Sequence, residues 1–214
     1  MSLGKALLDL LFPPRCAVCG KVGVHGVCAA CGEELPYCRT PLHERAGIGA
    51  CIAPLRYEGA VREALLAYKF RGGRSRCEGF GELLAQSAAE QLSGQFDLVT
   101  YVPVSEKRKA ERGYDQAYLL ARETCRRWET EPATLLRKKT HTAAQSSLSS
   151  REARRANVLG VYEAVNAEKI EGARILLIDD ILTTGATLAE CVRVLKEAGA
   201  ESVLCATLAA ADED

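Results

Sequence analysis

The chain has 214 residues, of which 48% are hydrophobic and 26% are charged, and this is the composition of a globular protein with one main core. Basic and acidic residues balance at 28 each. Collagen-like, prion-like and disordered classes are excluded by this composition. The apolar stretch 6–12 is interrupted by Asp9 and lacks a small-residue cleavage site. We therefore expect neither a secretory signal nor insertion into a membrane, and we predict a cytoplasmic protein.

Cysteines are concentrated near the start of the chain, where five of the ten lie within residues 16–38. Four of these five form two C-x-x-C pairs separated by eight residues: Cys16, Cys19, Cys28 and Cys31. Two such pairs can place four thiolates around Zn²⁺ in a closed structural site, and a reducing compartment favours metal binding over disulfides. We predict a small zinc ribbon with four cysteine ligands, within an N-terminal module of residues 1–50.

From residue 51 onward, the pattern changes to alternating helices and strands, which indicates a second domain of residues 51–214. Apolar residues at helical spacing predict helices over 60–70, 80–92, 113–128 and 186–198. Short apolar runs predict buried strands over 97–104, 174–179 and 202–208. This alternation predicts an α/β fold with a mainly parallel sheet covered on both faces. The polar segment 140–150 has no periodicity, and loops of this length inside a domain tend to be functional.

The segment 175–188, ILLIDDILTTGATL, carries the most chemical information. The predicted strand ends in Asp179 and Asp180, and the chain then turns through two threonines and Gly185 into a helix. At the carboxyl end of a parallel strand, such a turn presents backbone N–H groups and hydroxyls that attract a phosphate to the helix N-terminus. Paired carboxylates beside a phosphate suit ribose hydroxyls or Mg²⁺, which prefers oxygen ligands.

This segment resembles the phosphoribosyl pyrophosphate (PRPP) motif of the type I phosphoribosyltransferases. The resemblance implies a doubly wound phosphoribosyltransferase-like domain that binds PRPP together with Mg²⁺. It also implies that Asp179 and Asp180 hold the ribose hydroxyls and form the catalytic pair. The implied site for the 5′-phosphate is the loop of Thr183, Thr184, Gly185, Ala186 and Thr187.

Nearly the whole chain also resembles the ComF family of phosphoribosyltransferase-like proteins. Besides the cysteines, the residues that carry this resemblance are Pro103, Arg108, Arg112, Gly113, Asp115, Gln116, Arg137, Thr142, Gln145, Leu148, Arg154 and Asn157. Further PRPP contacts are expected after the first predicted strand and beside it, from Val104, Ser105, Lys69, Arg108 and Arg112. The implied flexible loop over PRPP carries Arg137, Thr142, Gln145, Arg154 and Asn157.

Two questions stay open at this level. ComF-like proteins often have a third C-x-x-C pair, of which only Cys38 remains here, so Cys38 either replaces one zinc ligand or has no metal role.

Residues 105–155 carry 13 Lys or Arg against 7 Asp or Glu, whereas residues 162–214 carry 4 Lys or Arg against 11 Asp or Glu. The basic segment indicates a phosphorylated or polyanionic ligand.

A phosphorylated or polyanionic ligand is compatible with two functions, and the sequence does not decide between them. One is phosphoribosyl transfer from PRPP to an unidentified acceptor. The other is a non-catalytic adaptor that binds single-stranded DNA and keeps PRPP as a regulatory ligand. The ComF resemblance connects both with DNA uptake, and it implies competence-machinery proteins as partners.

Overall fold

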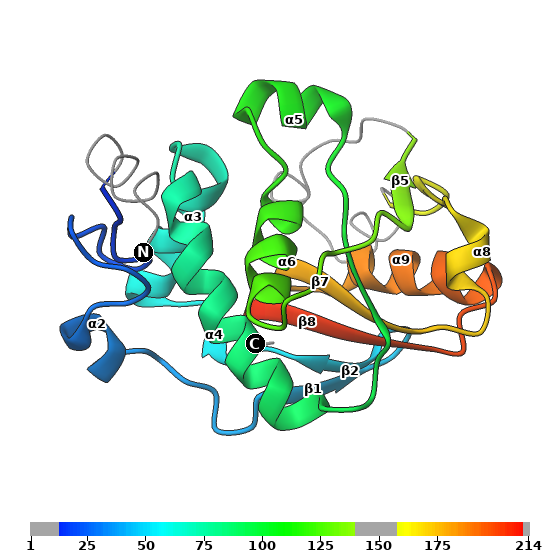
Figure 1. Cartoon of the computed structure of the whole chain (residues 1–214), viewed down its shortest axis with the longest axis horizontal. Helices are drawn as coiled ribbons and strands as arrows, with labels where there is room; N and C mark the ends of the chain where they lie inside the picture. The colour runs from blue at the N-terminus through cyan, green and yellow to red at the C-terminus, as the bar shows by residue number, and fades with distance from the viewer. Residues whose placement is uncertain (1–12, 140–157, 212–214) are drawn as a thin grey trace.

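The computed structural model describes residues 13–139 and 158–211, and its centre is a six-stranded sheet. The strands are β1 (Leu42–Arg45), β2 (Gly49–Ile52), β3 (Leu55–Arg56), β4 (Leu98–Tyr101), β7 (Arg174–Leu182) and β8 (Ser202–Ala210). Their order is β1-β2-β8-β7-β4, and β3 also pairs with β8. The β1–β2 pair is antiparallel, and the other pairs in this sheet are parallel. The predicted mainly parallel sheet is confirmed (Figure 1).

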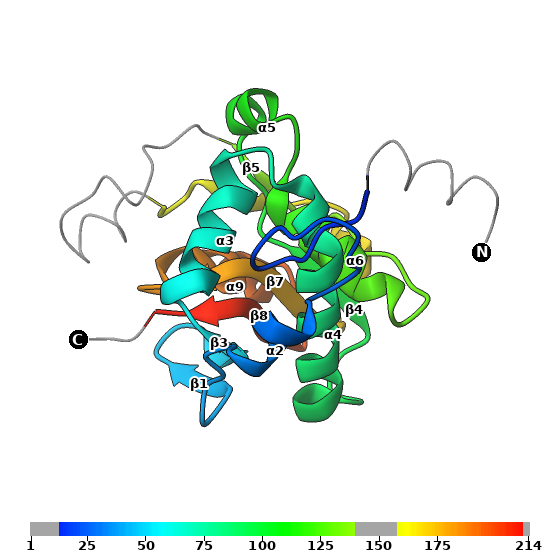
Figure 2. The same ribbon diagram turned by 90° about the vertical axis from the view of Figure 1, so that its left-hand side faces the viewer.

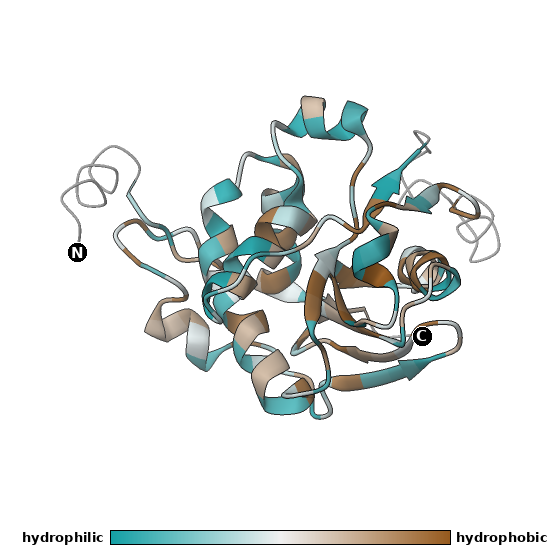
Figure 3. Ribbon diagram, turned by 45° about the vertical axis from the view of Figure 1, so that its right-hand side comes forward, coloured by the Kyte–Doolittle hydropathy of each residue, from teal (hydrophilic) through white to brown (hydrophobic). Residues whose placement is uncertain are grey.

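Helices cover both faces of the sheet, as in a doubly wound fold. The longer helices are α3 (Gly59–Phe70), α4 (Cys77–Leu92), α6 (Gln116–Arg126) and α9 (Ala186–Glu197). Successive β7 side chains enter opposite cores: Leu176 and Ile178 pack with α3, α4 and α6, whereas Ile175 and Leu177 pack with α9. Figure 3 shows the resulting apolar strands between more polar helix surfaces. Because both faces are buried, β7 reads in sequence as a continuous apolar run.

Several shorter elements complete the fold: α2 (Ala29–Glu33), the 3₁₀ helix η1 (Arg74–Arg76), α5 (Glu106–Arg112), β5 (Leu136–Lys138), β6 (Tyr162–Ala164) and α8 (Ala167–Ile170). β5 and β6 form a separate antiparallel pair. None of the helices within residues 13–139 and 158–211 has the length and hydropathy needed to cross a lipid bilayer.

Several predicted boundaries were wrong. The strand predicted over 97–104 ends at Tyr101, and the helix predicted over 80–92 begins at Cys77. The strand predicted over 174–179 continues to Leu182, because Ile181 and Leu182 pair with the end of β8. The two acidic residues therefore lie inside the last part of β7 and not at its end. The helix predicted from Gly113 begins at Gln116, since the Asp115 carboxylate accepts the N–H of Tyr118 at 3.0 Å and caps it.

The cysteine segment is built into the same body as the sheet. It lies at the end of the molecule occupied by α3 and α4, which Figure 2 faces. Cys16 and Ala17 are fully buried in the core that α4 shares. A Cβ on Gly79 of α4 would lie 2.8 Å from the Ala17 Cβ, so glycine permits this close approach. β1 and β2 belong to the main sheet, and the division predicted at residue 50 stays a prediction.

Candidate functional site

A cleft of about 490 Å³ opens beyond the carboxyl ends of β4 and β7. Its walls come from α3, from the segment between β4 and α6, from β5 and β6, and from the loop between β7 and α9. The predicted PRPP-site residues that line it are Lys69, Val104, Arg108, Arg112, Asp179, Asp180, Thr183, Gly185, Ala186 and Thr187. The structure thus gathers residues from distant parts of the chain at the crevice where α/β folds bind ligands.

The acidic pair forms the floor of this cleft. The Lys69 Nζ lies 2.8 Å from Oδ1 of Asp180, and the Asp180 side chain is only 6% exposed. The backbone N–H of Asp180 donates to Oδ1 of Asp179 at 2.9 Å. Burial, together with the neighbouring charge of Asp180, raises the pKa of Asp179. Oδ2 of Asp180 is buried and accepts no hydrogen bond within the described chain, so it is an acceptor that a ligand could satisfy.

The loop that follows the acids is held by the β1–β2 hairpin. Arg45 Nη1 donates to the Thr183 carbonyl at 2.6 Å, across 138 residues of sequence. Gly185 has φ 72° and is the N-cap of α9, and the hydroxyl of Thr184 accepts the N–H of Ala186 at 3.4 Å. Ile48, which is 3% exposed, packs directly against Gly185. The hairpin therefore fixes the loop's shape, a role that the sequence analysis missed because the contact is not local.

Basic side chains form the opposite wall. Arg112 donates to the Gln116 Oε1 at 2.7 Å, and its guanidinium lies 4.8 Å from the Phe70 ring centroid. Lys138 Nζ lies 5.2 Å from the ring centroid of Tyr162, and burial lowers the pKa of Lys138. Lys138 and Tyr162 are cleft residues that the site prediction omitted, although Lys138 stands in the basic run RKK.

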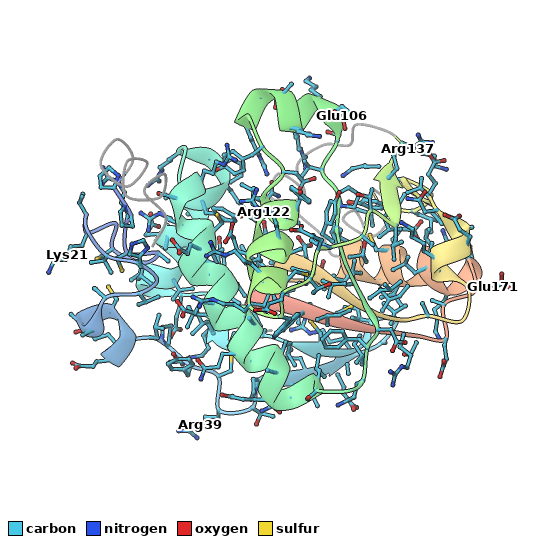
Figure 4. The ribbon with its side chains drawn as sticks, viewed as in Figure 1. Lys21, Arg39, Glu106, Arg122, Arg137 and Glu171 are labelled. Atoms are coloured by element: carbon cyan, nitrogen blue, oxygen red, sulfur yellow. The ribbon has the colours of Figure 1, made fainter. Side chains whose placement is uncertain are left out.

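Other predicted residues lie outside the cleft lining or are already engaged. One of them is Thr184, whose hydroxyl accepts the N–H of Ala186. Ser105 is buried as the N-cap of α5, outside the lining of the cleft, and the Val104 N–H donates to Asp115 Oδ2 at 3.0 Å. Arg137, labelled in Figure 4, pairs at the surface with Glu163 at 2.6 Å. The remaining loop residues, Thr142, Gln145, Arg154 and Asn157, lie outside the described residues. The roles assigned to these residues stay predictions.

The four cysteines of the two C-x-x-C pairs converge as predicted. The sulfur atoms of Cys16, Cys19, Cys28 and Cys31 all lie within 4.8 Å of one another, and those of Cys19 and Cys28 are 3.8 Å apart. A tetrahedron with Zn–S bonds of about 2.3 Å has sulfur atoms about 3.8 Å apart. Burial raises the pKa of Cys16, but N–H donors, above all Cys28, outweigh it and lower the pKa to about 6. The donor set fits a structural zinc ion.

Neighbouring residues tie this cluster to the main core. Arg76 Nη1 donates to the carbonyls of Ala17 and Val18, at 2.5 and 2.6 Å. Its positive charge also lies near the thiols of Cys16 and Cys19. Among the described residues, Cys38 does not belong to the four-cysteine group. The zinc site is therefore formed by the two predicted pairs and anchored through η1.

Comparison with known proteins yields two family matches. Residues 81–214 match the phosphoribosyl transferase domain, and residues 7–57 match the double zinc ribbon domain. The chain is also similar to a solved structure of glutamine PRPP amidotransferase from B. subtilis, at 23% identity and a TM-score of 0.45. That similarity covers 65% of this chain and 30% of the longer amidotransferase chain.

Two curated relatives match along most of the chain. The competence protein ComFC of Bacillus subtilis (strain 168) is 30% identical over 197 residues, which cover 90% of this chain and 76% of ComFC. The DNA utilization protein YhgH of Escherichia coli O157:H7 is 28% identical, covering 93% of this chain and all of YhgH. With the parallel sheet and the cysteine cluster, these matches establish that the chain belongs to the ComF family of phosphoribosyltransferase-fold proteins with an N-terminal zinc ribbon.

Proposed function

We propose that the cleft binds PRPP and that the protein acts in DNA uptake, as a phosphoribosyltransferase with an unidentified acceptor. The observation that carries this proposal is the carboxylate of Asp180, which lines a cleft together with cationic side chains and the phosphate-type loop, and whose buried Oδ2 has no hydrogen-bond partner among the described residues. A buried carboxylate oxygen without a partner is costly, and a ribose hydroxyl would supply the missing donor.

Each part of PRPP has a complementary part of the cleft. Asp179 and Asp180 would accept hydrogen bonds from the ribose hydroxyls, and the loop 183–187 would hold the 5′-phosphate at the start of α9. Arg108, Arg112 and Lys138 would face the pyrophosphate. Lys69 pairs with Oδ1 of Asp180 in the free protein and would be released toward the pyrophosphate when ribose hydroxyls bind this carboxylate.

Transfer requires little covalent chemistry from the protein. The acceptor's lone pair forms a bond to C1 of the ribose, while the C1–O bond to pyrophosphate breaks and pyrophosphate leaves with that electron pair. A nitrogen that carries hydrogen then loses one proton to solvent. The two carboxylates are suitable oxygen donors for Mg²⁺, which would neutralise charge on the leaving pyrophosphate. The chain's own contribution is to orient the ribose and to bind the pyrophosphate.

Calorimetric titration with PRPP and Mg²⁺ tests this proposal. Asp180→Asn and Thr183→Ala should each weaken binding about tenfold or more, because hydrogen bonds to charged groups contribute about 1.5–3 kcal/mol. Asp97→Asn is a matched control, since Asp97 pairs with Arg174 at the opposite end of β7. Equal affinities for the wild type and all three variants would refute the assignment of the site.

The second candidate, a single-stranded DNA adaptor, is favoured by one observation. α5 buries none of its residues, yet four of its seven side chains are basic: Lys107, Arg108, Lys109 and Arg112. In Figure 1 this helix projects beyond the rest of the fold. If α5 binds DNA phosphates, the affinity should fall steeply with salt in anisotropy titrations, and PRPP should compete through Arg108 and Arg112. An absence of DNA binding at low salt would eliminate this candidate.

A further inference from the structure

Helix α3 presents a second face that the core does not use. Its residues Val61, Leu65 and Tyr68 are buried beneath the helix. The adjacent face of the helix lines the cleft with Arg62, Leu66, Lys69 and Phe70, and Tyr57 lines it from the segment just before α3. We call these five residues the α3 wall. Phe70 is 60% exposed, although it stands at the edge of the cleft. Arg112 lies over one face of the Phe70 ring, and the exposed remainder of the ring offers a stacking surface beside the cleft.

Apart from Lys69, which pairs with Asp180, the residues of this wall have no contact with PRPP in the binding mode proposed above. The loop 183–187, the acidic pair and the cationic wall account for its phosphate, ribose and pyrophosphate. The incoming acceptor must approach C1 from the side opposite the leaving pyrophosphate. The α3 wall remains for it, and the contact between Phe70 and Arg112 marks the border between the two regions.

The side chains of this wall define a ligand chemistry. Tyr57, Leu66 and Phe70 provide aromatic and aliphatic surface, and Arg62 provides a guanidinium. Within the described lining, the acidic side chains are Asp179 and Asp180, so α3 itself contributes no carboxylate to the cleft. We propose that the α3 wall binds the acceptor and that the acceptor is an aromatic carboxylate, with its ring against Phe70 and its carboxylate on Arg62.

Arg62 forms an exposed ion pair and can therefore exchange its partner for a ligand. Its Nη1 lies 2.9 Å from Oε1 of Glu63, with side-chain exposures of 53% and 56%. Exposed pairs of this kind contribute little stability, so a ligand carboxylate can replace Glu63 at small cost. A planar guanidinium also binds a carboxylate through two parallel hydrogen bonds, which a neutral amide cannot match.

The test uses pairs of probes that share a ring and differ in the carboxylate: nicotinate with nicotinamide, and orotate with uracil. Binding of each probe to the zinc-loaded full chain is measured by equilibrium dialysis, both alone and with saturating PRPP and Mg²⁺. The acids should bind about tenfold more tightly than their neutral partners. Arg62→Gln should abolish this preference and leave the affinity for PRPP unchanged. Phe70→Leu should weaken both members of each pair alike.

Arg56→Gln is the matched control, because Arg56 also pairs with a neighbouring glutamate, Glu58 at 2.9 Å, but does not line the cleft. It should keep the preference for acids. If the acids bind no better than their partners, or if Arg62→Gln weakens PRPP instead, the proposal is wrong while the PRPP site stands. If PRPP does not bind, the proposed function fails, and a preference that depends on Arg62 in the free protein would still support the acid-binding wall.

Discussion

Gly185→Ala tests the fit between the PRPP-type loop and the β1–β2 hairpin. Gly185 adopts φ 72°, a conformation that residues with a Cβ rarely take. A Cβ built there would clash with Cδ1 of Ile48, because it would lie closer than the 3.0 Å that real contacts of this kind exceed. The substitution therefore combines a backbone penalty with a steric clash in a buried contact.

These two costs can be separated. The left-handed conformation costs a residue with a Cβ about 1–2 kcal/mol, and overpacking a buried contact costs about 1–3 kcal/mol more. We expect Gly185→Ala to lower the free energy of unfolding by about 2–5 kcal/mol. Gly94 has φ 74° and open space around it, so Gly94→Ala should show the backbone cost alone, about 1–2 kcal/mol.

The assay is urea denaturation of the zinc-loaded protein, with Ile48→Val as the rescuing change. Valine lacks the Cδ1 atom that clashes, so the double variant Gly185→Ala, Ile48→Val should recover about 1–2 kcal/mol relative to additivity. If Gly185→Ala costs no more than Gly94→Ala, or if Ile48→Val gives no rescue, the hairpin does not determine the shape of the loop.

Three further predictions follow from the buried charges and the cysteine cluster. Lys69→Met leaves Asp180 buried without its partner and should destabilise the fold by about 3 kcal/mol, and adding Asp180→Asn should restore much of this in thermal unfolding. Because the pKa of Asp179 is raised above 3.8, its carboxyl keeps a proton in the folded protein at pH values where the unfolded chain has lost it. The free energy of unfolding should therefore fall as pH rises from 3.8 toward the raised pKa, and this fall should be smaller in Asp179→Asn. Chelating zinc, or Cys16→Ser, should increase hydrogen exchange in residues 13–38 before the main sheet, and uniform exchange would contradict this.

Local sequence was sufficient for the acidic pair and the loop that follows it. The apolar run into Asp179, the threonines and Gly185 stand in one short window, so the strand, the turn and the helix start could be predicted from it, although the strand's last residues, 180–182, were missed. The four zinc ligands were predictable for the same reason, because two short spacings define the cluster.

The contacts that complete the site are not local, and the sequence analysis missed them. β1 reads LHER, a mixed polar sequence typical of an edge strand, and its Arg45 reaches Thr183 only through the fold. α5 has no apolar periodicity because it buries nothing, so helical spacing could not reveal it. β5 has three residues, which is too short for an alternating pattern to place Lys138 in the cleft.

A structure of the protein with PRPP and Mg²⁺ would show whether the cleft is the PRPP site. We expect the 5′-phosphate on the loop 183–187, a ribose hydroxyl on Oδ2 of Asp180, and the Lys69 amine withdrawn from that carboxylate. The pyrophosphate should lie against Arg108 and Lys138, with the α3 wall open beside C1. PRPP bound outside this cleft, or a cleft that stays empty at saturating PRPP with the Lys69–Asp180 pair intact, would contradict the account.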